Sequence, residues 1–297
     1  MNTKLTFVHA LSPLHAGTGQ GVGVIDLPIA REKATGIPYL PGSSLKGTLR
    51  DLCMHTRKED VFGPSSTNAG DYAGSAQFSD QRLLLLPIRS LKGTFAWVTS
   101  PYLLQRLIRD AKSIDGTIAC PAAPPALTGK QFAVAKTSCA LLYLKKKKDG
   151  TGTIPTVILE DLDLDSKSTF EADAWAEWIG ERVFGDKDSL KARLCIVSDD
   201  VLSFLLNTAT EITARIKLEE KSKTVARGAL WYEEALPAET ILSGLLVATE
   251  VKAKTEVVFE VVDSVLNKHK TLQLGGKATV GRGVCVVGAW PQTQGGK

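Results

Sequence analysis

The chain has no run of about 18 consecutive apolar residues, which is the length that a membrane-spanning helix requires. Its first residues carry one lysine and then an interrupted apolar stretch, without the continuous apolar segment of a secretory signal peptide. We therefore expect residues 3–10 to form a strand. These absences predict a cytoplasmic protein that has no membrane partner.

Cysteine is sparse and scattered. The five cysteines are far apart and include no C-x-x-C pair: Cys53, Cys120, Cys139, Cys195 and Cys285. Neither a structural zinc site nor a disulfide framework is expected from such spacing. Most of these cysteines have apolar neighbours, so we expect them to pack as small core residues.

The common catalytic and nucleotide-binding signatures are also missing. No nucleophile-elbow, zinc-protease, kinase or paired-metal motif occurs. Residues 17–23 have the spacing G-x-G-x-G-x-G and lead into VIDLPI instead of a helix, so they are not a dinucleotide fingerprint. Gly276-Lys277 lacks both the upstream glycine of a P-loop and its following serine or threonine. The two glycine loops are either flexible connectors or places where backbone amides approach a phosphate chain.

The composition that remains is that of an ordinary globular protein. The 297 residues are 43% hydrophobic and 23% charged, which is enough for one elaborated domain or two small ones. A net charge of +4 is a weak signal by itself. However, the basic residues gather locally, in residues 46–58, 145–148 and 215–227, while acidic residues gather in 159–165.

The order of expected elements is strand, helix, strand, strand, helix and a last strand. These elements are placed at residues 3–10, from near Ser43, at 74–88, at 93–100, from Pro101 and at 241–251. This order predicts an α+β fold of the ferredoxin-like or RRM-like type. We expect a single domain over 1–297, with residues 113–200 as a long irregular insertion that contains one short helix near 175–183.

Residues 213–234 predict a β-hairpin. Arg215, Lys217 and Glu219 alternate with apolar residues, and the return strand ends in Trp231 and Tyr232. A protruding hairpin with a basic face and an apolar wedge could insert between nucleotides. An ordinary edge hairpin of an antiparallel sheet fits the same pattern.

Residues 41–50, PGSSLKGTLR, predict an anion site at a helix start. Ser43 or Ser44 can cap the helix, and the free amides of its first turn attract negative charge. Lys46 opposes the helix dipole, which an anionic ligand would explain. The alternative is a solvated lysine.

Asp26 is an isolated acid in the apolar run 24–29, so it either caps a turn or is displayed for chemistry. Nearby basic residues favour chemistry on bound RNA, namely Arg31, Lys33, Lys46 and Arg50. There Asp26 could coordinate Mg²⁺ or assist attack by a 2′-hydroxyl, and His15 could share the proton transfer unless it is structural. Glu233 and Glu234 are weaker candidates, because we expect both to face solvent.

Three segments together resemble a known family. Residues 14–51, residues 228–237 (GALWYEEALP) and residues 272–283 (LQLGGKATVGRG) resemble the RAMP superfamily of CRISPR effector proteins, and within it the repeated backbone subunits of type III-B (Cmr) complexes. The resemblance runs nearly from end to end and is weakest over 113–200.

The resemblance implies a ferredoxin-like palm with the 213–234 hairpin as a thumb. Copies would stack along a CRISPR RNA beside other Cmr subunits, and each thumb would interrupt the duplex formed with a complementary target RNA. In the family, the acid of the glycine-rich loop is required for target cleavage that depends on Mg²⁺ or another divalent cation. Asp26 holds that position here.

The expected RNA contacts combine the glycine loops, the helix start and the hairpin. They are Gly17, Gly19, Gly21, Arg31, Ser43, Ser44, Lys46, Arg50, Arg215, Lys217, Lys223, Arg227, Gly276, Lys277 and Arg282. Two functions stay open: a guided endoribonuclease subunit, and a non-catalytic filament subunit that only binds the guide. Both predict binding that weakens with salt and depends little on guide sequence.

Overall fold

The computed structural model describes residues 2–19, 25–65, 70–114, 118–136, 139–219 and 225–291, without the side chains of Leu218 and residues 225–228. Within these residues no helix is long and apolar enough to cross a membrane. Gly21 and Lys223, two of the expected RNA contacts, lie outside the described residues, as does the side chain of Arg227.

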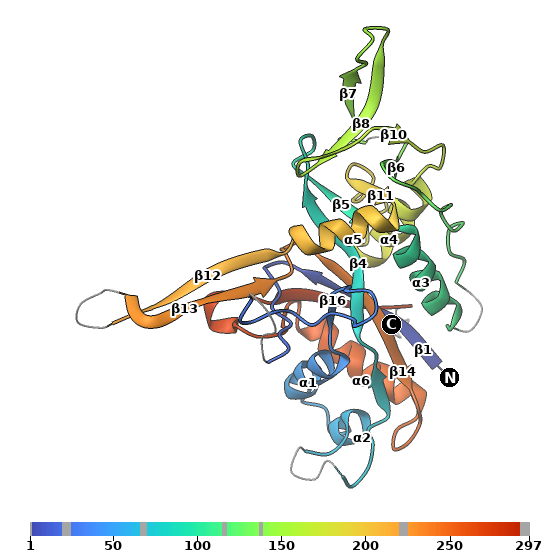
Figure 1. The fold of residues 1–297 in the computed structure, drawn as a ribbon. Coiled ribbons are helices and arrows are strands. Elements are labelled where there is room, and N and C mark those ends of the chain that lie inside the picture. The colour runs from blue at the N-terminus through green and yellow to red at the C-terminus, as the bar shows by residue number, and fades with distance from the viewer. Residues whose placement is uncertain are drawn as a thin grey trace.

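A ferredoxin-like palm forms the lower half of the molecule in Figure 1. Its elements in chain order are β1 (Asn2–Ala10), α1 (Gly42–Leu52), β4 (Gln81–Arg89), β14 (Ile241–Ala248), α6 (Thr255–Lys268) and β16 (Val284–Trp290). The four strands lie side by side in the order β4-β14-β1-β16, and β1 pairs antiparallel with both β14 and β16. The predicted α+β fold of ferredoxin-like type is therefore confirmed.

The assignment of elements to the palm was wrong in its second half. The segment 241–251 supplies the third palm strand, β14, while α6 and β16 follow as the second helix and the last strand. The expected strand at 93–100 and helix from Pro101 exist as β5 (Phe95–Thr99) and α3 (Pro101–Lys112), but they belong to an inserted lobe. A local pattern shows that a strand exists but not which strand it pairs with, so the two arrangements look alike in sequence.

The chain leaves the palm after β4 and returns at β14, so the inserted part is wider than residues 113–200. It also has more regular structure than expected. After β5 and α3 come β6 (Gln131–Val134), β7 (Tyr143–Lys146), β8 (Thr153–Leu159), β9 (Leu162–Leu164), β10 (Ser166–Lys167), α4 (Asp173–Phe184), β11 (Leu194–Val197) and α5 (Asp199–Thr208). The lobe extends the palm sheet in the order β10-β6-β11-β5-β4.

The short elements are β2 (Tyr39–Leu40), α2 (Lys58–Phe62), β3 (Ala76–Phe78), β15 (Leu272–Gln273) and a 3₁₀ turn at Ala278–Val280. The single strand expected at 74–88 is two strands, β3 and β4, separated at residues 79–80. Pro87 does not end β4, because it stands opposite Trp97 in the pairing with β5. Asp80 in the break accepts the N–H of Gly42 at 2.9 Å and so ties β4 to the start of α1.

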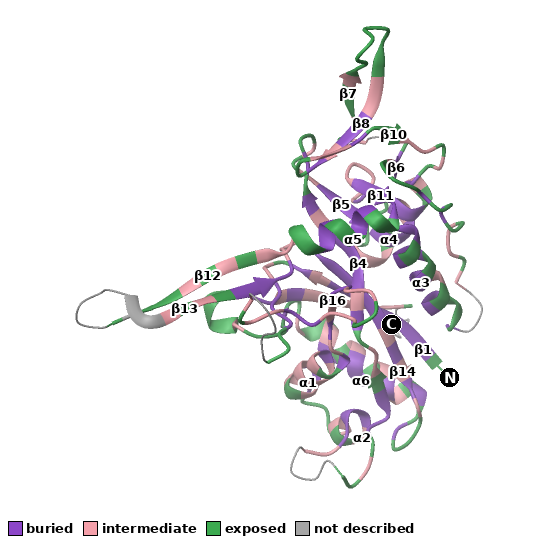
Figure 2. Cartoon of the chain, in the orientation of Figure 1, coloured by how far each residue is buried: buried purple, intermediate pink, exposed green. Residues whose placement is uncertain are grey.

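The large sheet is buried on both faces (Figure 2). On one face α1 and α6 contribute Leu45, Leu49, Val258 and Val262, while the apolar residues of α3 and α4 cover the other face. β1 lies between these layers: Val8 belongs to the first cluster and Phe7 to the second. Neighbouring residues on a strand point to opposite faces, so both faces of β1 are covered.

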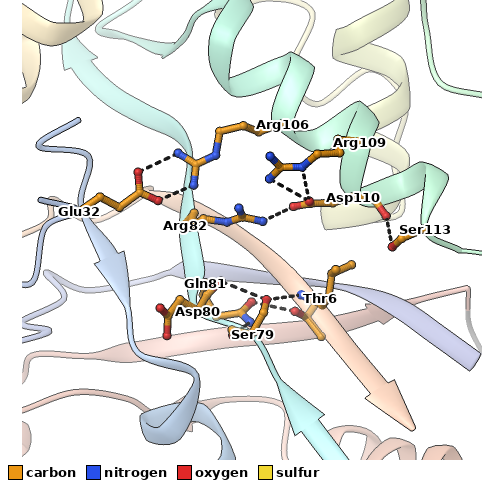
Figure 3. Close-up of polar contacts among 11 residues, drawn as sticks. Thr6, Glu32, Ser79, Asp80, Gln81, Arg82, Arg106, Arg109, Asp110 and Ser113 are labelled. Carbon is orange, nitrogen blue, oxygen red and sulfur yellow. Dashed lines mark hydrogen bonds and ion pairs between the residues drawn. The ribbon is translucent and has the colours of Figure 1, made fainter. Parts of the chain in front are cut away.

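Partly buried ion pairs fasten the lobe to the palm (Figure 3). Arg106 of α3 donates to both carboxylate oxygens of Glu32, at 3.1 and 2.5 Å. Arg82 of β4 pairs with Asp110 of α3. Burial by itself raises the pKa of Glu32, but the Arg106 bonds outweigh it and leave that pKa below its usual value. The loop between Glu32 and β2 is therefore held against α3.

All five cysteines are free thiols, as the spacing predicted. Cys53, Cys195 and Cys285 are buried, and burial raises the pKa of Cys285 to about 12. These three pack as small apolar side chains in the core.

Two hairpins project from the body (Figure 1). The first, called the thumb, consists of β12 (Glu211–Leu218) and β13 (Val225–Ala235), where a hairpin was expected at 213–234. The second, called the arm, consists of β7 and β8 in the inserted lobe. No hairpin was expected there.

Candidate nucleic-acid interface

A cleft of about 520 Å³ lies between one side of α1, from Ser43 to Asp51, and two glycine loops. It is lined by His15, Ala16, Gly17, Gly19, Pro41, Ser43, Ser44, Gly47, Thr48, Asp51, Gly275 and Gly276. Six residues chosen from the sequence therefore meet at one place: His15, Gly17, Gly19, Ser43, Ser44 and Gly276. Of the three segments that meet here, two are the glycine loops and one is the predicted helix start.

Three glycines of the cleft pack closely against His15 and are therefore more than flexible connectors, namely Gly17, Gly275 and Gly276. Gly276 donates its N–H to the carbonyl of His15 at 2.9 Å. Gly275 has a φ of +70°, and a Cβ there would lie 2.4 Å from the His15 oxygen. A Cβ on Gly17 would lie 2.6 Å from Nε2 of His15. Backbone instead of side chains therefore forms this wall, which lets a phosphate chain approach closely.

The start of α1 differs from the prediction that Ser43 or Ser44 caps the helix. Pro41 occupies the N-cap position, and no side chain caps the helix. The serines instead lie inside the first turn, which contains no acidic residue. Ser43 is exposed and Ser44 half-buried. An uncapped helix start with two hydroxyls and no acid suits an anion.

Lys46 lies on the other side of α1. With Ser43, it lines a second cleft of about 460 Å³ whose other walls come from α2, β3 and the residues between them. Ser43 is the residue shared by the two clefts. Arg50 lines neither cleft, and its Nε makes a long 3.4 Å hydrogen bond to the carbonyl of Gly63.

Asp26 lies at the base of the thumb. The segment around it runs along the outer edge of β13, where Leu27 donates its N–H to Tyr232 at 3.1 Å and Glu234 donates its N–H to Leu27 at 3.0 Å. Oδ2 of Asp26 accepts the N–H of Tyr232 at 2.8 Å, and the side chain is exposed. The carboxylate is thus tied to the backbone of β13, instead of capping a turn of its own segment, and it is displayed to solvent. Its role in chemistry stays a prediction.

Glu234 holds this segment in place. The residue is 3% exposed, and its carboxylate accepts the N–H of Ile29 at 3.1 Å, Nη2 of Arg31 at 2.6 Å and the hydroxyl of Thr210 at 2.9 Å. Its carbonyl accepts Nδ1–H of the buried His15 at 2.6 Å. This bond assigns the imidazole proton to Nδ1, so Nε2 is the acceptor nitrogen. One residue therefore fixes both Asp26 and His15.

Arg31 uses its guanidinium inside the protein. Besides Glu234 it donates to the carbonyls of Gly36 at 3.0 Å and Leu206 at 3.1 Å. The geometry favours a brace between the thumb base and the loop before β2, in place of the RNA contact that we expected.

Glu233 is buried on the opposite face of β13. It is 3% exposed and accepts Nζ of Lys277 at 2.9 Å, Nε1 of Trp231 at 2.8 Å and Nε of Arg215 at 3.4 Å. Burial by itself raises its pKa, but the bonds from Lys277 and Trp231 and the charge of Arg215 lower it to about 2.

The expectation that Glu233 and Glu234 face solvent was wrong. Segments distant in sequence cover both faces of β13 at its base: Lys277 and Arg215 cover Glu233, and Arg31 covers Glu234. Two consecutive acids after an aromatic pair gave no sign of these partners.

Arg282 is a buried arginine beside this network. It is 6% exposed, and Nη2 donates to the hydroxyl of Thr213 at 3.0 Å. Its Nη1 has no hydrogen-bond partner among the described residues. Lys217, farther along the thumb, is exposed.

The described residues contain no cluster of three or more side chains that could hold a metal by themselves. Asp26 offers one exposed carboxylate. Mg²⁺ is commonly held by one or two carboxylates, phosphate oxygens of a substrate and water. The residues present therefore fit a cation only if bound RNA supplies further oxygen ligands.

Comparison with known proteins decides the family. The model of the RAMP superfamily matches residues 7–286. The chain belongs to the RAMP superfamily. A RAMP relative, the Cmr endoribonuclease Cmr4 of Pyrococcus furiosus, is 35% identical over 95% of this chain and 94% of its own length.

Solved RAMP structures share the fold. An oligomeric Cmr4 from Pyrococcus furiosus matches with a TM-score of 0.73 and 27% identity, over 97% of this chain and 98% of that one. A chain of a type III-B Cmr-beta complex bound to cognate target RNA matches with a TM-score of 0.72 over 97% of both chains. Its identity is 21%, so this second likeness concerns the fold alone.

Proposed function

We propose that this protein is the backbone subunit of a type III-B CRISPR effector complex and cuts target RNA that is paired with the guide. The observation that carries the proposal is the exposed Asp26 carboxylate, fixed at the base of a projecting hairpin, at the other end of the glycine loop that lines the cleft. The relative named as a Cmr endoribonuclease and the oligomeric relative support cutting and stacking of copies.

The cleft suits the sugar–phosphate chain of the guide. Its walls offer backbone from the glycine loops and the hydroxyls of Ser43 and Ser44, which bind phosphate whatever the base. The guide RNA would therefore be held by its backbone, and base pairing would select the target. Copies of the subunit, joined by other Cmr proteins, would line up along one guide in the cytoplasm.

Cleavage would begin when a 2′-hydroxyl of the target attacks the adjacent phosphorus. The proton of that hydroxyl passes to a base, for which Asp26 and Nε2 of His15 are the candidates. The bond to the 5′-oxygen then breaks, leaving a cyclic phosphate and a 5′-hydroxyl that takes its proton from water. A divalent cation held by Asp26 and the RNA would supply positive charge against the phosphate. Glu234 keeps both candidate bases in position.

Substitution of Asp26 tests the proposal in the assembled complex with guide and complementary RNA. We expect Asp26→Ala to bind target normally and to cut it about 100- to 10,000-fold more slowly, as for loss of a general base. Asp26→Asn is the matched control, since its amide oxygen can still accept the Tyr232 N–H while the charge is lost. Both variants should be inactive if the charge matters.

The alternative, a filament subunit that does not cut, gives the opposite result. The bond from Tyr232 shows that Asp26 also has a structural role at the thumb base. If Asp26→Ala binds target and still cuts it at the same spacing, Asp26 is not catalytic. If Asp26→Asn is active and Asp26→Ala is not, the carboxylate only shapes the loop. Target cleavage that persists in the presence of a metal chelator would contradict the proposed role of a divalent cation.

A further inference from the structure

The arm is a second projecting hairpin in which lysines concentrate. β7 pairs antiparallel with β8 from Tyr143 opposite Thr156 to Lys146 opposite Thr153, and residues 147–152 form the turn. Lys146, Lys147 and Lys148 are all exposed, and no ion pair is found for them in the described structure. Figure 2 shows the exposed tip standing clear of the body.

The arm is firmly attached at its base. Val157 and Leu159 of β8 are fully buried in the core, and so is Leu164 of β9. Leu91 donates its N–H to Ile158 at 3.1 Å, which joins β8 to the end of β4. Because its foot is part of the core, the arm holds its tip at a defined place away from the body.

The turn at the tip is also ordered. Lys147 donates its N–H to Gly152 at 2.9 Å, and Asp149 accepts both the N–H and the hydroxyl of Thr151, at 2.9 and 2.7 Å. These hydrogen bonds lower the pKa of Asp149. The only acid of the tip is therefore engaged with the turn itself, and the lysines beside it project into solvent.

The charges of the arm are separated along its length. The acidic residues lie at the foot, around the turn between β8 and β9, where Asp163 pairs with Lys145. Lysines on edge strands can serve to prevent unwanted strand pairing. That explanation does not extend to Lys147 and Lys148, because they lie in the turn, where no strand edge needs protection.

Exposed apolar residues accompany the lysines. Leu144 is 62% exposed and Tyr143 is 39% exposed. An ammonium group pairs with phosphate, and a tyrosine ring can stack on an unpaired base. This combination on one hairpin fits single-stranded or partly paired RNA better than it fits a purely acidic protein surface.

We propose that the arm is an RNA-binding element which contacts the sugar–phosphate backbone through Lys146, Lys147 and Lys148. The arm and α1 lie at opposite ends of the molecule (Figure 1), so the RNA that the arm meets lies outside this copy's own cleft. In a stack of copies that RNA is held by a neighbouring subunit. This inference rests on the proposed function in so far as it needs RNA as a partner.

The test compares two triple variants of the full chain. Lys146→Ala/Lys147→Ala/Lys148→Ala removes the charges of the tip. Lys112→Ala/Lys130→Ala/Lys270→Ala removes three exposed lysines from the body and is the matched control. Affinity for labelled guide RNA, and for target RNA in the guide-loaded complex, is measured by fluorescence anisotropy over a range of salt concentrations.

We expect the tip variant to bind RNA about 10- to 100-fold more weakly than the control. The slope of log affinity against log salt should fall by about 2, since each phosphate contact on a single strand contributes about 0.7. A variant with arginine at all three positions should restore binding. If only the affinity for guide RNA falls, the arm contacts the guide strand. If only the affinity of the guide-loaded complex for target RNA falls, the arm contacts the target. Either result supports RNA binding by the arm.

Equal affinity and slope for the two triple variants, with the wild type binding RNA, would overturn the inference and leave the proposed function intact. A wild type that does not bind RNA would instead contradict the proposed function itself. The inference about the arm would also be overturned if the tip variant lost self-association in the absence of RNA while its RNA affinity stayed unchanged. The arm would then dock on a neighbouring subunit instead of on RNA.

Discussion

The thumb and the arm are both two-stranded hairpins that project from the body, yet they are fastened in different ways. The foot of the thumb is held by buried charges, Glu233 and Glu234, each bonded to groups from distant segments. The foot of the arm is held by apolar side chains, and its one ion pair, Lys145–Asp163, is partly exposed.

This difference fits the roles that we propose for the two hairpins. Hydrogen bonds to buried charges are directional, so the thumb network holds Asp26 and His15 in defined positions, as the proposed cleavage chemistry would require. Apolar packing fixes the direction of the arm, while the lysines at its tip remain free to adapt to a phosphate chain. If both proposals hold, the rigid foot of the thumb belongs to cleavage and the adaptable tip of the arm belongs to RNA binding.

Removing Glu234 should have the largest effect. Glu234→Ala leaves Arg31 without its ionic partner, so we expect the unfolding free energy to fall by about 3–5 kcal/mol. Cleavage should be lost as well, because Asp26 and His15 lose their common support. Urea denaturation measures the first effect and target cleavage the second. Glu160→Ala, an exposed acid at the foot of the arm, is the control and should cost about 0.5 kcal/mol or less.

A double-mutant cycle with Arg31 sharpens this result. If Arg31→Ala in the Glu234→Ala background adds little further loss, the two side chains act as a pair. Fully additive losses of unfolding free energy would contradict a direct interaction between Arg31 and Glu234.

Glu233 should make the stability of the thumb foot depend on pH. Its folded-state pKa of about 2 lies below the ordinary value of 4.5, so its contribution is complete above pH 4.5 and is lost as the pH falls toward 2. The difference in unfolding free energy between wild type and Glu233→Gln should therefore be largest near neutral pH and shrink in acid. A difference that does not change with pH would show that the carboxylate charge contributes nothing.

The ion pair of the arm should have the smallest effect. Lys145→Ala breaks a partly exposed pair, so we expect the unfolding free energy to change by about 0.2–1 kcal/mol. Added salt should reduce the difference between variant and wild type. A loss as large as that from Glu234→Ala would remove the distinction between the two hairpins.

The parts of the fold that depend on local signals were predictable. Pro101 at the first position of α3, the apolar stripe of α1 and the alternation in the thumb each identified an element. What sequence could not give was the pairing. β14 lies beside β1 and β4, although the whole lobe and the thumb separate it from β4 in the chain. The arm was missed for a related reason: β7 is only four residues long, and the lysines that end it show no alternation of apolar and polar residues.

For the candidate interface, residue type picked out segments that the fold brings together, but it did not reveal the contacts between their side chains. Asp26, His15 and the cleft glycines were identified, because an isolated acid and clustered glycines stand out in a sequence. The burial of Glu234 and its bond to Arg31 were not foreseen, because each residue was weighed alone, whereas the bond spans more than two hundred residues of chain. A single sequence carries no signal for such a pair.

The closing of the interface across the whole chain has a consequence during protein synthesis. His15 bridges to Gly276, and Asp26 is hydrogen-bonded to Tyr232. The N-terminal residues therefore cannot form these contacts until residues near the C-terminal end have been synthesised. Until then β1 lacks both of its neighbours in the palm sheet, and no cleft exists to receive RNA. A nascent chain should therefore be unable to load a guide or cut a transcript, and competence should arise at one late step.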